Sequence, residues 1–185
     1  PESECVTVLQ GMKQEAPDGV KVSYAMGSGF SEADEHEKAK AMALAEESDV
    51  IVAVVGGSSS RFVGAVFDAN GAASKGTGSR SMDCGEGMDT AKVHIPAAQE
   101  ELIAALARLG KPLVTVVIAG RAYCIEKIEN ASDAVLYAFY PGPMGGRAVA
   151  ELLYGSSNPS GRLPVSMPRH VGQLPVCYNY RTSVA

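Results

Sequence analysis

Short, continuously apolar runs alternate with amphipathic stretches along this chain. The runs at residues 50–55, 112–118 and 134–139 are rich in Val, Ile and Leu, a pattern typical of strands buried on both faces of a parallel sheet. Residues 20–25 follow a Pro-Asp-Gly turn signal and also have the composition of a strand. The pattern therefore predicts three inner strands and a further strand near the start of the chain.

Amphipathic segments with Pro, Ser or Gly at their ends lie between the predicted strands. We expect Ser31 to cap a helix whose first turn is acidic, and Pro96 to open another helix that Gly110 closes. Apolar residues recur at helical spacing within these segments. The remaining predicted helices cover residues 5–15, 125–128 and 147–154.

Strands and helices joined by short connections predict an α/β fold, namely a layered α/β/α sandwich with a mostly parallel central sheet. Ligands bind to such sheets beyond the carboxyl ends of the strands, which are expected at residues 56–58, 120–121 and 140–142. The connection at residues 57–95 is far longer than the usual ~4–6 residues, and connections of that length are mostly functional. We expect it to be one long catalytic loop.

Composition narrows the classes of function. The 185 residues carry a formal net charge of −5 and are 46% hydrophobic, which fits one globular domain or slightly less. No cluster of Lys and Arg indicates nucleic acid or an anionic membrane as a partner, and no apolar run reaches the ~18–20 residues that cross a bilayer. The chain also opens without the features of a signal peptide.

The sequence indicates no metal and no cofactor. The four cysteines are scattered, without the spacing of a zinc site, and neither a phosphate-binding glycine motif nor a calcium loop occurs. Cys84 is close to acidic residues, but none of the three histidines is an evident base for it, so we expect no cysteine nucleophile. His94 is expected to be a loop or helix-entry residue rather than a ligand.

An acidic, glycine-rich segment lies within the long loop at residues 82–89. It spaces Asp83, Glu86 and Asp89 three residues apart and places Glu86 between two glycines. Glycine tolerates positive φ and has no Cβ, so such a loop can bring one carboxylate close to a ligand, as a general acid requires. A solvated surface loop is the alternative, and it is the interpretation that we favour for Asp83.

Several further motifs occur in a distinctive order along the chain. They lie at residues 54–57, 85–89, 95–103, 110–121, 132–134, 140–146, 155–169 and 173–175. Their order resembles the C-terminal α/β sandwich domain of glycoside hydrolase family 3, which includes β-glucosidases and β-xylosidases. The resemblance covers residues 48–178.

The resemblance implies a retaining glycosidase in which a (β/α)8 barrel supplies an aspartate nucleophile. In that family a loop of the C-terminal domain supplies the general acid/base glutamate, and Glu86 matches it. Retaining hydrolysis uses two carboxyl groups about 5–5.5 Å apart, one as nucleophile and one as acid/base. Asp89 matches an aspartate of the same loop and is expected to touch substrate or position Glu86. Arg121 is expected to bind sugar or the barrel, or else to cap carbonyl groups or pair with Asp133.

The resemblance also implies how this chain relates to a larger enzyme. Residues 1–178 are expected to form a single, truncated domain, and residues 179–185 the start of a linker or tail. The implied partners are the enzyme's own N-terminal barrel and an oligo- or aryl-glycoside, and the implied compartment is periplasmic or extracellular. Without the nucleophile of the barrel, this chain is expected to be inactive alone.

Some residues leave alternatives open. Thr90 stands where the family has an arginine, so an ion pair of the loop is expected to be lost. This departure motivates a second hypothesis, a non-catalytic α/β carbohydrate-binding or regulatory module derived from the same fold. Tyr140, Tyr178 and Tyr180 are candidates to stack on sugar rings, although Tyr140 fits the core or a domain interface better.

Overall fold

A computed structural model describes residues 5–59, 65–67, 69–70, 73–75, 82–85 and 90–177 of the chain. Its centre is a parallel sheet of three strands in the order β1-β4-β5. The strands are β1 (Ile51–Gly56), β4 (Leu113–Ile118) and β5 (Ala134–Tyr137). They confirm the three inner strands that the apolar runs predict.

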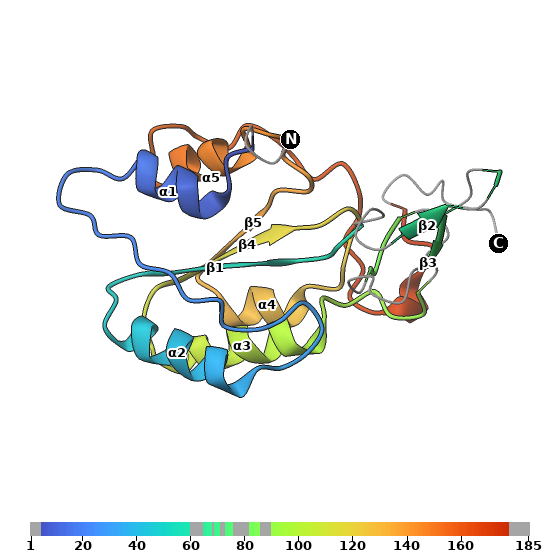
Figure 1. Ribbon diagram of the computed structural model, residues 1–185, viewed down its shortest axis with the longest axis horizontal. Coiled ribbons are helices and arrows are strands. Elements are labelled where there is room, and N and C mark those ends of the chain that lie inside the picture. Colours follow the sequence, from blue (N-terminus) through green and yellow to red (C-terminus); the bar gives the residue numbers. More distant parts are fainter. Residues whose placement is uncertain are drawn as a thin grey trace, which may run out of the picture.

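Helices cover both faces of the sheet (Figure 1). One face carries α2 (Glu35–Glu46), α3 (Ala97–Ala107) and α4 (Glu126–Ala131), and the opposite face carries α1 (Val8–Gln14) and α5 (Gly145–Leu153). This arrangement confirms the predicted α/β/α sandwich. None of the helices in the described ranges has the length and apolarity that a bilayer crossing requires.

The apolar core lies around the central strand β4. Val116 and Val117 are 0% exposed and Leu113 is 1% exposed, because a middle parallel strand is covered on both faces. Ile103 and Leu106 of α3 belong to the same buried cluster. Each such aliphatic side chain contributes roughly 1.5–3 kcal/mol, so this core holds the strand ends in place.

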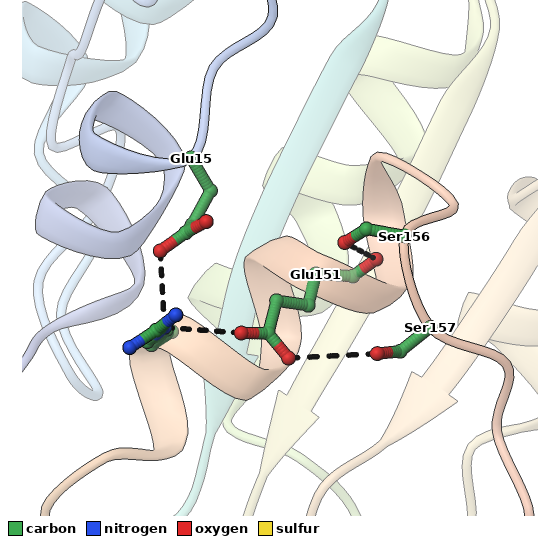
Figure 2. Close-up of polar contacts among 5 residues, drawn as sticks. Glu15, Glu151, Ser156 and Ser157 are labelled. Atoms are coloured by element: carbon green, nitrogen blue, oxygen red, sulfur yellow. Dashed lines mark hydrogen bonds and ion pairs between the residues drawn. The ribbon is translucent and has the colours of Figure 1, made fainter.

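Helices α1 and α5 meet through glycine. A Cβ added at Gly11 of α1 would lie 2.2 Å from the carbonyl oxygen of Gly146 on α5, so the two backbones are in contact. Beside this contact, Arg147 Nε lies 3.0 Å from Glu15 Oε1 and 3.0 Å from Glu151 Oε1, and Figure 2 shows the two carboxylates converging. Exposed ion pairs contribute under about 1 kcal/mol, so close backbone packing is the main link between the helices.

The predicted start of α2 is wrong by three residues. The helix begins at Glu35 because Asp34, and not Ser31, is its cap. Asp34 Oδ1 accepts hydrogen bonds from the N–H groups of His36 and Glu37, both at 3.0 Å, which satisfies two donors of the first turn.

Residues 20–25 do not form the strand that their composition predicts. A strand is held by hydrogen bonds to a neighbouring strand. Here an apolar groove of about 820 Å³ lies next to this segment. The groove is lined both by residues 23–27 and by residues 50–55 of the β1 region. The strand composition is therefore present without a paired neighbour.

The long connection between β1 and α3 contains a feature that the sequence pattern did not indicate. Strands β2 (Ala65–Phe67) and β3 (Ala73–Lys75) pair as an antiparallel ribbon. The ribbon lies beyond the carboxyl end of β1 (Figure 1). Each strand has three residues, which is too short for alternation to be recognised over the ~4–8 residues of a typical strand pattern.

Candidate functional site

The carboxyl ends of β1 and β4 meet at one edge of the sheet, where ligands bind in folds of this kind. Gly56 pairs with Ile118, and a Cβ added at Gly56 would lie 1.7 Å from the carbonyl oxygen of Ile118. The amide of Gln99, a residue 6% exposed, closes the end of β1. Its Oε1 accepts from Gly56 N at 2.8 Å, and its Nε2 donates to the carbonyl oxygen of Phe30 at 2.8 Å. The strand end is thus fixed before the long loop leaves it.

Asp83 is bound to this edge of the sheet. Its Oδ1 accepts a hydrogen bond from Ser58 N at 2.7 Å, and its Oδ2 accepts one from the Tyr123 hydroxyl at 2.5 Å. Asp83 N in turn donates to the carbonyl oxygen of Ser58 at 3.0 Å. The expectation that Asp83 is a solvated loop residue is therefore wrong, because residues 25 and 40 positions away supply its partners.

Tyr123 is the site residue that sequence reasoning missed. It follows β4 and is 1% exposed. Burial raises the pKa of its phenol, and the hydrogen bond to Asp83 and the charge of that carboxylate raise it further, so the hydroxyl stays a donor. Gly57 leaves room for this hydroxyl, because a Cβ there would lie 2.2 Å from it. The one signal in the sequence was an aromatic residue two positions after Arg121, at a predicted strand end.

A second contact holds the next loop residue. Cys84 is 4% exposed, and its Sγ lies 3.3 Å from the Tyr140 hydroxyl. The Tyr140 ring lies against Gly120, where an added Cβ would be 2.7 Å from the ring atom Cε2. The preceding residue, Phe139, has a φ of +50°, a conformation that costs about 1–3 kcal/mol outside glycine.

Tyr140 belongs to the rim of this site. It is 49% exposed, so it is not a core residue, and its placement at a domain interface stays a prediction. Partial burial of the Tyr140 side chain raises the pKa of its phenol, and the contact with Cys84 raises it further. Tyr140 thus presents a partly exposed ring beside the acidic loop. Tyr178 and Tyr180 lie outside the described residues.

Glu86 and Asp89, the predicted catalytic and substrate-binding carboxylates, also lie outside the described residues. On one side of them, Gly85 has a φ of +119°, which side chains other than glycine rarely adopt. On the other side, Thr90 Oγ1 donates to the carbonyl oxygen of Lys92 at 2.9 Å. The backbone therefore requires a glycine immediately before Glu86, and Thr90 forms a local turn contact.

Arg121 lies at the same edge of the sheet and is partly buried. Its carbonyl oxygen accepts a hydrogen bond from the Tyr137 hydroxyl. The alternative pairing of Arg121 with Asp133 is wrong, because Asp133 Oδ2 accepts from Leu113 N at 2.8 Å at the start of β4. The start and end of a strand of this length are roughly 17 Å apart.

His94 lies just before α3, as expected. It forms a parallel bridge with Cys124, and its Nδ1 lies 3.5 Å from Glu100 Oε1. The other oxygen of Glu100 pairs with Lys127 Nζ at 2.7 Å, and this hydrogen bond raises the pKa of Lys127. The group ties α3 to α4. Across the described ranges, no set of three or more His, Cys, Asp and Glu side chains is placed to hold a metal ion.

Comparison with known proteins places this geometry in a family context. The sequence profile of the Glycosyl hydrolase family 3 C-terminal domain matches residues 1–184. The chain is 34% identical to a periplasmic beta-glucosidase of Salmonella typhimurium, over 96% of this chain and 23% of that protein. It is also 34% identical to a beta-xylosidase of Formosa agariphila, over 94% of this chain and 21% of that protein.

Solved structures agree with the sequence comparison. A beta-glucosidase from Listeria innocua in complex with gluconolactone superposes with a TM-score of 0.76 at 30% identity, over 97% of this chain and 21% of that one. A beta-glucosidase from Erythrobacter marinus superposes with a TM-score of 0.75 at 33% identity, over 94% of this chain and 24% of that one. The chain thus spans about a fifth to a quarter of the length of these proteins.

Proposed function

The chain belongs to glycoside hydrolase family 3 as its C-terminal domain, and from that premise we propose that it supplies the general acid/base of a retaining β-glycosidase. Glu86 is the residue that we assign to this role. The observation that carries the proposal is the binding of Asp83 and Cys84, three and two residues before Glu86, to Ser58 at the carboxyl edge of the sheet. This edge is where α/β folds present the groups that contact ligands.

The proposed reaction has two steps. First, Glu86 donates a proton to the glycosidic oxygen as its bond to the anomeric carbon breaks, and a carboxylate of the barrel forms the new bond to that carbon. Second, the Glu86 carboxylate takes a proton from water as the water oxygen bonds to the anomeric carbon. The bond from that carbon to the barrel carboxylate breaks in the same step, which frees the nucleophile and releases the sugar with retained configuration. This chain provides one carboxyl group of the pair, so we propose that it is inactive without the barrel.

The names of the relatives support a substrate class. They include a beta-glucosidase and a beta-xylosidase, so we propose terminal β-linked glucose or xylose in oligo- or aryl-glycosides. Asp89 and Arg121 are proposed to contact the substrate, with Arg121 placed at the carboxyl edge by the end of β4.

The proposed partner is an N-terminal barrel of the same enzyme. The chain spans about a fifth of its curated relatives, which supports a larger protein around it. We propose residues 1–178 as one domain of that protein and residues 179–185 as the start of a linker. A relative named periplasmic supports a periplasmic or extracellular compartment.

Glu86→Ala in the full-length enzyme tests the assignment. We expect kcat/KM on disaccharides and alkyl glycosides to fall about 10²–10⁴-fold, because these leaving groups need a proton. The loss should be much smaller on aryl glycosides with acidic leaving groups. Azide should restore turnover and yield the β-glycosyl azide, because it attacks the glycosyl-enzyme without a base. Glu101→Ala, at an exposed glutamate of α3, is the matched control.

Wild-type turnover of disaccharides by Glu86→Ala would refute the assignment. If the barrel of the full-length protein also lacked its nucleophile, the non-catalytic carbohydrate-binding module would become the better hypothesis.

A further inference from the structure

We propose that Tyr123 is a positioning residue for the acid/base step and acts through Asp83 on the loop that leads to Glu86. The inference rests on the function proposed for Glu86. The contact between Tyr123 and Asp83 lies within the described residues. The proposed role of Tyr123 is to hold the acid in place, not to be the acid.

The Tyr123–Asp83 contact joins two loops that leave neighbouring strands. Tyr123 follows β4, whereas Asp83 lies in the long connection that begins after β1. The hydroxyl lies 2.5 Å from Asp83 Oδ2, and Asp83 Oδ1 lies 2.7 Å from Ser58 N. With Tyr123 1% exposed, the bond to the carboxylate is shielded from water, and such charge-assisted bonds are about twice as strong as neutral ones.

The same contact closes the long excursion of the chain. The carbonyl oxygen of Ser58 accepts hydrogen bonds from the N–H groups of Asp83 and Cys84 at 3.0 and 3.3 Å. Ser58 and Asp83 are therefore joined through both backbone and side chain, across 25 positions of sequence. Glu86 follows Asp83 by only three positions in the sequence, so this anchor is close to it along the chain.

A short tether makes the acid sensitive to this anchor. A general acid must lie within hydrogen-bond reach of the oxygen that it protonates, and a displacement of about 1 Å can cost about 10²-fold in rate. Removal of the Tyr123 hydroxyl leaves the aromatic ring in place but takes a donor from the Asp83 carboxylate. Proton transfer should therefore suffer more than substrate binding.

The test is Tyr123→Phe in the full-length enzyme, assayed on series of aryl β-glucosides and aryl β-xylosides with leaving groups of decreasing acidity. We expect kcat/KM to fall about tenfold or more on the poorest leaving groups and less than about threefold on the best, since the best need no acid. Tyr154→Phe is the matched control. It removes a hydroxyl that donates to the carbonyl oxygen of Met12 at 2.9 Å in the α1–α5 layer, and should leave the leaving-group dependence unchanged.

A double-mutant cycle examines the route through Asp83. Asp83→Ala should reproduce the leaving-group dependence. The Tyr123→Phe/Asp83→Ala double variant should lose no more than the larger single loss, because Asp83→Ala already removes the contact that Tyr123→Phe breaks. Additive losses would overturn the proposal. If Tyr123→Phe does not fold, Asp83→Asn carries the same test, since it keeps the volume and removes the charge.

The outcomes separate this inference from the proposed function. A uniform loss across the series, or a rise in KM alone, would overturn the positioning role, because a general structural defect does not select by leaving group. If Glu86→Ala is leaving-group dependent and Tyr123→Phe is not, the positioning role alone fails. If Glu86→Ala shows no such dependence, the assignment of Glu86 fails.

Discussion

Burial at the carboxyl edge of the sheet changes the acidity of the tyrosines around the loop anchor. It raises the pKa of Tyr137 to about 12, and it also raises the pKa of Tyr123 and of Tyr140. The carboxylate of Asp83 adds to the rise at each of them. These phenols therefore remain protonated donors through neutral and mildly alkaline pH.

The raised pKa of Tyr137 predicts a loss of stability at alkaline pH. Its phenol ionises near pH 10 in the unfolded chain and near pH 12 in the folded one, so the folded state binds more protons between these values. The stability from this group is complete below pH 10 and is lost as the pH rises towards 12. The free energy of unfolding should fall by up to about 1.4 kcal/mol per pH unit for one such group.

Urea unfolding at several alkaline pH values measures this slope. Tyr137→Phe should flatten it relative to wild type, because phenylalanine does not ionise. Tyr24→Phe, at a side chain that is 64% exposed, should keep the wild-type slope. Equal slopes for all three proteins would contradict the prediction.

Single residues show how far local sequence could define the site. The glycine before Glu86 was recognisable, and the φ of +119° at Gly85 gives its physical reason. Asp83 was misread because its partners, Ser58 and Tyr123, are 25 and 40 positions away in sequence. Tyr123 was missed for the same reason. The roles of Glu86, Asp89 and Arg121 stay predictions.

At the scale of elements, the α1–α5 contact depends on a glycine within a helix. Gly11→Ala would favour an isolated helix by about 1 kcal/mol. Here the added Cβ would lie 2.2 Å from the carbonyl oxygen of Gly146, a backbone atom that cannot move alone. Overpacking costs about 1–3 kcal/mol, so after the gain in helix propensity we expect a net destabilisation of up to about 2 kcal/mol.

The urea midpoint of Gly11→Ala should accordingly fall. Gly161→Ala is the control, because an added Cβ at Gly161 meets nothing within 4 Å. Its free energy of unfolding should change by less than about 0.5 kcal/mol. A Gly11→Ala midpoint at or above wild type would show that the two helices can separate without cost.

Elements were predictable where their own residues carry the signal. β1, β4 and β5 are mostly apolar, and the central strand β4 is buried on both faces, as the pattern of a parallel strand between helices predicts. Residues 20–25 have the right composition, but a strand also needs a paired neighbour, which local composition cannot report. The predicted start of α2 is wrong for a different reason. Ser31 and Asp34 are both capping residue types, and the backbone conformation selects between them.

At the scale of the whole molecule, β1 lies at an edge of the described sheet. Val50 and Val54 of this region are 54% and 46% exposed, and Tyr24 and Met26 across the same groove are 64% and 49% exposed. An exposed apolar edge offers backbone groups and side chains for pairing with another chain. The chain produced on its own should therefore self-associate through this edge.

Val54→Lys should weaken that association, because a lysine on an edge strand opposes pairing with a second apolar edge. Sedimentation velocity over a range of concentrations should show larger species for wild type and a shift towards monomer for the variant. Val165→Lys is the control, since Val165 is 44% exposed and does not line the groove, so the same charge is added away from the edge. If both lysine variants reduce association equally, net charge governs the association and not the β1 edge. If wild type is monomeric at every concentration, the prediction of self-association through this edge is wrong.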